Sequence, residues 1–104
     1  MKNFTDKAPT EAHPYGYIIK PDGTVDQMPE PANGDEGFSL EQLQTAVGGY
    51  IEPVYSPVAD AADKALLADE EGLIKQLEPN PAASILAARP IVGNLVVLPR
   101  ELFE

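Results

Sequence analysis

The chain has 104 residues, of which 43% are hydrophobic, and its 17 acidic and 7 basic side chains give a formal net charge of −10. This length fits one domain, and the absence of cysteine excludes disulfides and thiolate chemistry. The excess of acidic residues disfavours direct binding to nucleic acid. It is compatible with a basic partner, a bound cation or a role as an acidic mimic of nucleic acid, although its plainest effect is solubility. No run approaches the ~20 apolar residues of a membrane span, and no secretory signal opens the chain, so we expect a cytoplasmic protein.

The first third of the chain predicts an arm followed by a hairpin. Residues 1–14 are polar and are expected to be disordered, and His13, the only histidine, has no second histidine to help it hold a metal. Residues 15–20 and 24–28 are expected to pair as strands around a turn at 21–23, because Pro-Asp-Gly is typical of a tight turn. The following segment, up to residue 37, is expected to be a loop.

The clearest local signal is a capped helix over residues 40–47. Ser39 and Gln42 have the spacing of a capping box, in which each side chain binds the backbone N–H of the other residue. Phe38 and Leu43 are placed for a hydrophobic staple, and Gly48 provides a left-handed helix end. The apolar face is expected to consist of four residues, Leu40, Leu43, Ala46 and Val47.

A strand is expected over residues 50–55, and Pro53 places it at a sheet edge or at a bulge because proline lacks a ladder donor. Residues 56–63 are expected to form a loop. Residues 64–69 predict a strand that ends in a tight turn at 69–72, with a helix as the alternative because the stretch is rich in alanine. Residues 73–77 fit either a short strand or a single helical turn.

The last part of the chain predicts a short helix and a buried strand. Asn80 is suited to be an N-cap and Pro81 to be the first helical residue, so a helix is expected over 82–88 with Ile85 and Leu86 facing the core. The branched apolar run at 91–98 predicts a central strand that is buried on both faces. Residues 100–104 are expected to be a C-terminal tail.

These elements together predict a single α+β domain over residues 15–99. Its sheet is expected to be small and mainly antiparallel, with about five strands, one capped helix and one short second helix.

Four stretches also carry a resemblance: G-G-Y-I-E-P-V at 48–54, A-D-E-E-G-L-I-K at 68–75, L-E-P-N-P-A-A at 77–83 and I-V-G-N-L-V-V at 91–97. In order and spacing they resemble the domain of unknown function family 3846, over roughly residues 15–98. One departure is segment 57–63, which is longer than the expected link. The resemblance implies an association with bacteriophages, conjugative plasmids and their hosts. It implies no activity, so no residue takes a role from it.

The residues do not predict an enzyme. A nucleophilic hydrolase needs a base beside its nucleophile, and the only histidine lies in the arm. The three acids at 69–71 resemble a solvated turn and lack the alternate oxygen ligands of a calcium loop. No phosphate-binding glycine motif is present. We therefore expect no catalytic residue, no metal site and no cofactor.

A binding role is the leading hypothesis, with a protein of the host cell as the expected partner. A second hypothesis is a small nucleotide ligand or sponge activity in an oligomer, with the N-terminus of the second helix and Arg89 and Arg100 facing the phosphate. A third is an acidic nucleic-acid mimic, which ranks lower because most acids lie in loops. The candidate binding residues are Tyr17, Tyr50, Glu52, Tyr55, Asn80 and Arg89.

Overall fold

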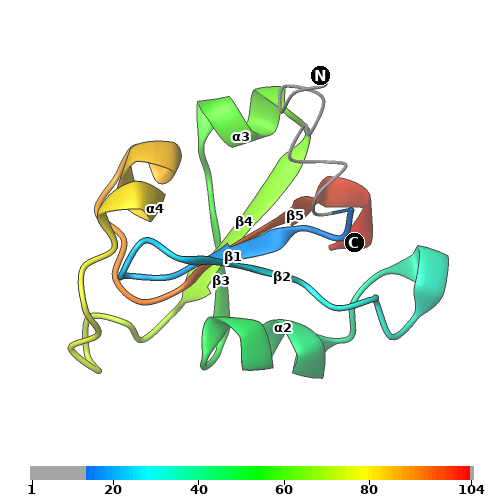
Figure 1. Ribbon diagram of the computed structural model, residues 1–104, viewed down its shortest axis with the longest axis horizontal. Coiled ribbons are helices and arrows are strands. Elements are labelled where there is room, and N and C mark those ends of the chain that lie inside the picture. Colours follow the sequence, from blue (N-terminus) through cyan, green and yellow to red (C-terminus); the bar gives the residue numbers. More distant parts are fainter. Residues whose placement is uncertain (1–13, 104) are drawn as a thin grey trace, which may run out of the picture.

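The computed structural model describes residues 14–103, in which a five-stranded sheet forms the centre of the fold (Figure 1). The strands are β1 (Tyr17–Ile19), β2 (Val25–Gln27), β3 (Ile51–Val54), β4 (Lys64–Asp69) and β5 (Leu95–Pro99). Their spatial order is β2-β1-β5-β4-β3, and all neighbouring strands are antiparallel. The expected α+β class and antiparallel sheet are confirmed, and residues 64–69 form a strand and not a helix.

Helices cover both faces of this sheet. Helix α2 (Leu40–Val47) lies on one face, whereas α3 (Pro57–Ala61) and α4 (Pro81–Ala87) lie on the other (Figure 1). Short 3-10 helices, η2 (Gly34–Glu36) and η3 (Arg100–Leu102), complete the described elements. The central strand β5 packs against both layers, so Leu95 and Val97 face one apolar cluster while Val96 and Leu98 face the other. Its predicted burial on both faces is confirmed.

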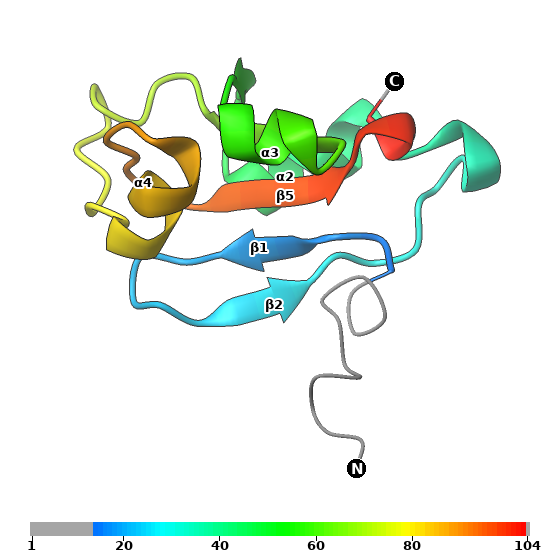
Figure 2. The same ribbon diagram turned by 90° about the horizontal axis from the view of Figure 1, so that it is seen from above.

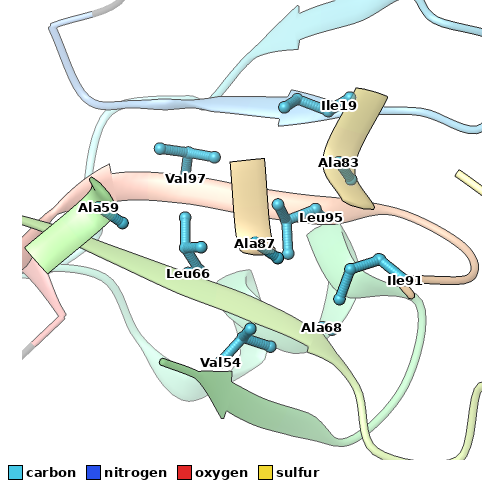
Figure 3. Close-up of a cluster of buried hydrophobic side chains, with 10 residues drawn as sticks. All are labelled: Ile19, Val54, Ala59, Leu66, Ala68, Ala83, Ala87, Ile91, Leu95 and Val97. Atoms are coloured by element: carbon cyan, nitrogen blue, oxygen red, sulfur yellow. The ribbon is translucent and has the colours of Figure 1, made fainter. Parts of the chain in front are cut away.

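The cluster beneath α3 and α4 is built with small helix residues. Ala59 of α3 and Ala83 and Ala87 of α4 are buried against Leu66, Leu95 and other strand residues (Figure 3). Alanine at these positions lets short helices approach the sheet closely. The Ser56 hydroxyl also donates to the Leu86 carbonyl at 2.8 Å, which joins the start of α3 to α4.

The cluster under α2 contains the predicted capped helix. The Ser39 hydroxyl accepts from the Gln42 N–H, and the Gln42 side chain accepts from the Ser39 N–H, both at 3.1 Å. Phe38 and Leu43 are buried in this cluster, and Gly48 has φ 96° as a left-handed cap. The expectation for Leu40 is wrong: this first-turn residue is 60% exposed because only Leu43, Ala46 and Val47 reach the sheet.

Two expectations for the α3–α4 layer are also wrong. Residues 57–61 are helical and not part of a loop, because the Ser56 side chain accepts from the Ala59 N–H and Pro57 occupies the first turn. Helix α3 therefore fills the segment that is longer than expected, and β3 and β4 still pair directly. Ile85 does not face the core and is 82% exposed, since Ala83 and Ala87 form the buried stripe of α4.

The end of the chain differs slightly from expectation. The last strand begins at Leu95 and not at residue 91, because Gly93 has φ 76° and interrupts the extended run. The tail packs on the domain: the Phe38 N–H donates to the Leu102 carbonyl at 3.0 Å, and Leu102 and Phe103 are half-buried beside the α2 cluster. The expected arm and His13 lie outside the described residues, apart from Pro14. Within residues 14–103, no helix has the length and apolar character to cross a bilayer.

Candidate functional site

The loop at residues 69–77 follows β4 and is held by a dense set of backbone hydrogen bonds. The Gly72 N–H donates to the Asp69 carbonyl at 3.1 Å, and the Lys75 N–H donates to the Glu71 carbonyl at 2.9 Å. The Leu77 N–H then donates to the Gly72 carbonyl at 3.1 Å. This segment is a compact turn that contains one helical i→i+4 bond. Of the two alternatives expected for residues 73–77, the single helical turn is therefore the one that describes it, and the short strand is not formed.

A buried acid fixes the start of this loop. The Asp69 side chain is 1% exposed; its Oδ1 accepts from the Glu71 N–H at 2.8 Å, and its Oδ2 lies 2.8 Å from the Lys75 Nζ. Burial of a carboxylate is costly unless it is paired and hydrogen-bonded, and here both conditions hold. The hydrogen bond to Asp69 raises the pKa of Lys75, which keeps its ammonium charged.

Two glycines permit the close packing around this pair. A Cβ on Gly49 would lie 2.5 Å from the Lys75 Nζ and 2.8 Å from the Asp69 Oδ2, so a side chain at this position would displace the ion-paired groups. A Cβ on Gly72 would lie 2.8 Å from Val92 Cγ2. The Lys75 ammonium also donates to the Gly48 carbonyl at 3.3 Å, and the loop is therefore anchored to the link between α2 and β3.

The anchored loop presents two large apolar side chains to solvent. Leu73 is 81% exposed and Ile74 is 83% exposed, although the backbone on both sides of them is hydrogen-bonded. Single exposed apolar residues are common on protein surfaces, but two adjacent ones on an ordered turn form a local apolar patch. Neither side chain contributes to the two core clusters. Their exposure therefore has no evident role in folding.

These side chains border a surface hollow of about 310 Å³. Glu52 of β3 and Arg89, which follows α4, line it together with Leu73 and Ile74. The wall also includes Pro90 and Val92, so both apolar and charged groups line the hollow. The hollow thus brings together Glu52 and Arg89, two of the six candidate binding residues.

The other four candidates lie elsewhere. Tyr50 is 61% exposed and belongs to the base of the loop, since its carbonyl accepts from the Glu70 N–H at 2.9 Å. Tyr55 is 73% exposed and borders a different hollow of about 290 Å³. Tyr17 is half-buried against the α3–α4 cluster, where burial raises its pKa. Asn80 is fully buried, with its amide bonded to the chain's own backbone.

The arginines expected to face a phosphate do not converge. Arg89 lines the hollow beside Leu73, whereas Arg100 lines the hollow beside Tyr55. Arg100 is also engaged, because its Nη2 lies 2.7 Å from the Asp60 Oδ1 and its Nε lies 3.3 Å from the Asp63 Oδ1. Between residues 14 and 103, no three His, Asp or Glu side chains are grouped so as to hold a metal ion.

The main residues of this site, Leu73, Ile74 and their support Asp69–Lys75, were not among the candidates from sequence. A signal for them exists in the stretch A-D-E-E-G-L-I-K, where a Leu-Ile pair directly follows an acidic tight turn and is itself followed by Lys75 and Gln76. Such an apolar pair, placed between an acidic turn and a lysine, indicates a surface patch more than a core segment.

A comparison with protein families matches the chain over residues 15–101 to the domain of unknown function DUF3846. Because this match covers most of the 104 residues, the chain belongs to that family. No curated protein and no solved structure matches the chain.

Proposed function

We propose that the chain is a non-catalytic binding module that docks on another protein through Leu73 and Ile74. The observation that carries this proposal is that both side chains are more than four-fifths exposed on a turn whose backbone is fixed. An ordered turn loses little conformational entropy on binding, so burial of its apolar side chains translates more fully into affinity. Burial of one such side chain is worth about 1.5–3 kcal/mol.

The surroundings of the patch also favour a protein partner. Arg89 is exposed beside Leu73 and Ile74, and arginine next to apolar anchors is typical of the energetically important part of an interface. The adjacent hollow of about 310 Å³ would receive one side chain of the partner. The family resemblance implies an association with bacteriophages and conjugative plasmids. We therefore propose that the partner is a protein in the cytoplasm of the host cell.

Two features make a nucleotide ligand the weaker proposal. The Asn80 amide is already bonded to the backbone, and Arg100 is paired with Asp60 and Asp63. A ligand phosphate would have to displace those contacts. Catalysis has no support either, because the one strongly buried acid among residues 14–103, Asp69, is neutralised by Lys75.

The test is affinity capture from host lysate with the wild-type chain and a Leu73→Ser/Ile74→Ser double variant. The matched control is Ile85→Ser, since Ile85 is as exposed as Ile74 but does not line the hollow. We expect the double variant to retain the wild-type melting temperature and lose at least ~90% of the captured protein, as loss of one apolar anchor already costs about tenfold in affinity. Ile85→Ser should capture normally.

A photo-crosslinking residue at position 73 should join the same captured protein, and one at position 85 should not. Capture should also resist added salt, because an apolar contact is not screened. Equal capture by the double variant, or capture that disappears as salt rises, would contradict docking through the apolar patch.

A further inference from the structure

The two edges of the sheet differ in their backbone groups. The Glu70 N–H donates to the Tyr50 carbonyl, so by antiparallel alternation residues 50, 52 and 54 turn their backbone groups toward β4. The backbone groups of residues 51, 53 and 55 then point away from the sheet. Pro53 occupies an outward position where it has no N–H, and this confirms the edge location predicted for the proline. The β3 edge is therefore blocked against further pairing.

Within residues 14–103, the β2 edge has no such block. The Lys20 N–H donates to the Thr24 carbonyl at 2.9 Å and the Met28 N–H donates to the Gly16 carbonyl at 3.0 Å, which places the inward groups of β2 at residues 24, 26 and 28. Val25 and Gln27 therefore direct their N–H and carbonyl groups away from the sheet. Both residues are exposed, and β2 lies outside the area covered by α3 and α4 (Figure 2).

A hollow of about 550 Å³ lies beside this edge, between the β1–β2 hairpin and α2. Ile18 and Ala46 are among its apolar lining residues, and Asp26 and Glu41 are among its acidic ones. Asp26 points to this side of β2, whereas Val25 and Gln27 point to the opposite side because side chains alternate along a strand. A strand added to β2 would place every second side chain near this hollow.

The charges around the edge specify the kind of strand that fits. Four acids, Asp22, Asp26, Glu30 and Glu41, lie along the hairpin and the hollow, and among the described residues Lys20 is the one base that lines the hollow. Lys20 is already paired with Asp26 at 2.7 Å. Hydrogen bonds from Thr24 hold the pKa of Asp22 below its usual range, so this carboxylate stays charged. Pairing with a second copy would bring acids against acids, whereas a basic segment would neutralise them.

We infer that β2 accepts an extended basic segment of a partner protein as an added strand. Backbone groups of Val25 and Gln27 bind the segment, its lysines or arginines face the acidic hollow, and its intervening apolar side chains cover Val25. This surface involves none of the residues of the 69–77 loop, so the inference stands independently of the docking proposed for Leu73 and Ile74. Strand addition of this kind takes its affinity from main-chain hydrogen bonds and its selectivity from alternate side chains.

The probe is an end-capped peptide of alternating lysine and valine, titrated into the full isotopically labelled chain and followed by nuclear magnetic resonance. The peptide should slow hydrogen exchange at the Val25 and Gln27 amides at least tenfold, with no comparable change at the inward amide of Asp26. A peptide of alternating glutamate and valine should leave all three amides unchanged.

Proline variants separate strand addition from simple charge attraction. Val25→Pro and Gln27→Pro each remove an outward donor and leave the β1–β2 ladder intact, so each variant should fold. Each should lower the affinity for the lysine–valine peptide about tenfold or more. Val25→Thr, which keeps the N–H, should bind it normally. The inference would be overturned if the proline variants bound the lysine–valine peptide as tightly as the wild type, or if the peptide slowed exchange at the Asp26 amide as much as at Val25 and Gln27. A concentration-dependent dimer of the chain that Val25→Pro abolishes would also overturn it.

Discussion

The Asp69 carboxylate and the Lys75 ammonium meet at 2.8 Å, and the two residues enclose the turn that carries Leu73 and Ile74. Their side chains differ in exposure, 1% for Asp69 and 37% for Lys75, so the pair lies at the boundary between the sheet end and solvent. Gly49 leaves the space in which the pair forms. A buried charge pair is weak evidence for stability in itself, but it defines one geometry. Here it fixes the loop that exposes the apolar patch.

Asp69→Asn should destabilise the protein by about 1–3 kcal/mol, because an amide nitrogen would then face either the Glu71 N–H or the Lys75 ammonium in a buried site. The matched control is Asp26→Asn. Asp26 makes an equally short ion pair, 2.7 Å to Lys20, but is 55% exposed, so its substitution should cost less than about 1 kcal/mol. Urea unfolding of the three chains measures both values, and equal losses would show that burial of Asp69 is unimportant.

The Asp69–Lys75 pair also predicts a dependence on alkaline pH. Its hydrogen bond raises the pKa of Lys75 in the folded chain, so the stability it contributes is fully present below the unfolded-state pKa of about 10.4 and is lost as pH rises through the folded value. The difference in urea midpoint between wild type and Asp69→Asn should stay constant from about pH 7 to 9 and shrink above about pH 10.4. A difference that persists unchanged at higher pH would exclude the ammonium as its source.

Local sequence signals predicted those elements whose cause is itself local. The Ser39–Gln42 capping box and the Asn80–Pro81 helix start are both present, because caps depend on residues within one turn. Ser56 and Pro57 form an equivalent cap-proline start, but the helix that follows has only five residues and so has too little apolar periodicity to be predicted. The prediction that Ile85 faces the core was wrong because Ala83 and Ala87 occupy the buried stripe of α4, and hydrophobicity alone does not indicate this.

The candidate site was less predictable because it depends on contacts between distant segments. Glu52 and Arg89 line one hollow only through the β3–β4 pairing and the position of the residues after α4. The exposure of Leu73 and Ile74 contradicts the usual expectation that a large apolar pair is buried. The contact between Asp69 and Lys75 requires a turn geometry that the acidic run did not reveal.

Pro53→Ala should make the chain self-associate. The substitution restores an outward N–H on β3 and removes the feature that blocks this edge, while the β3–β4 hydrogen bonds remain. Folding stability should change by less than about 1 kcal/mol, mainly through the greater freedom of the unfolded chain. Light scattering at rising protein concentration should show larger species for the variant. Pro57→Ala, in the first turn of α3, is the control for loss of a proline elsewhere and should stay at the wild-type mass.

Asn80→Asp should be strongly destabilising although aspartate is normally as good an N-cap as asparagine. The Asn80 Oδ1 accepts from the Ala83 N–H at 3.1 Å, but its Nδ2 donates to the Ile19 carbonyl at 3.0 Å and to the Gly93 carbonyl at 2.7 Å. An introduced carboxylate would keep the cap and direct negative charge at two buried carbonyls. We expect a loss of about 3 kcal/mol or more at pH 7.

Protonation should relieve part of that loss, because a neutral carboxyl group regains one donor. Burial and the facing carbonyls raise the folded-state pKa of the new group above its unfolded value of about 3.9, so its penalty is present above the unfolded pKa and declines as pH falls toward it. The urea midpoint of Asn80→Asp, measured against wild type at each pH, should therefore recover between about pH 7 and 4. The control is Ser39→Asp at the half-buried cap of α2, where the side chain has no such carbonyl partners and the change should stay within about 0.5 kcal/mol. Equal effects at positions 39 and 80 would show that Asn80 acts only as a helix cap and does not join β1, α4 and the segment before β5.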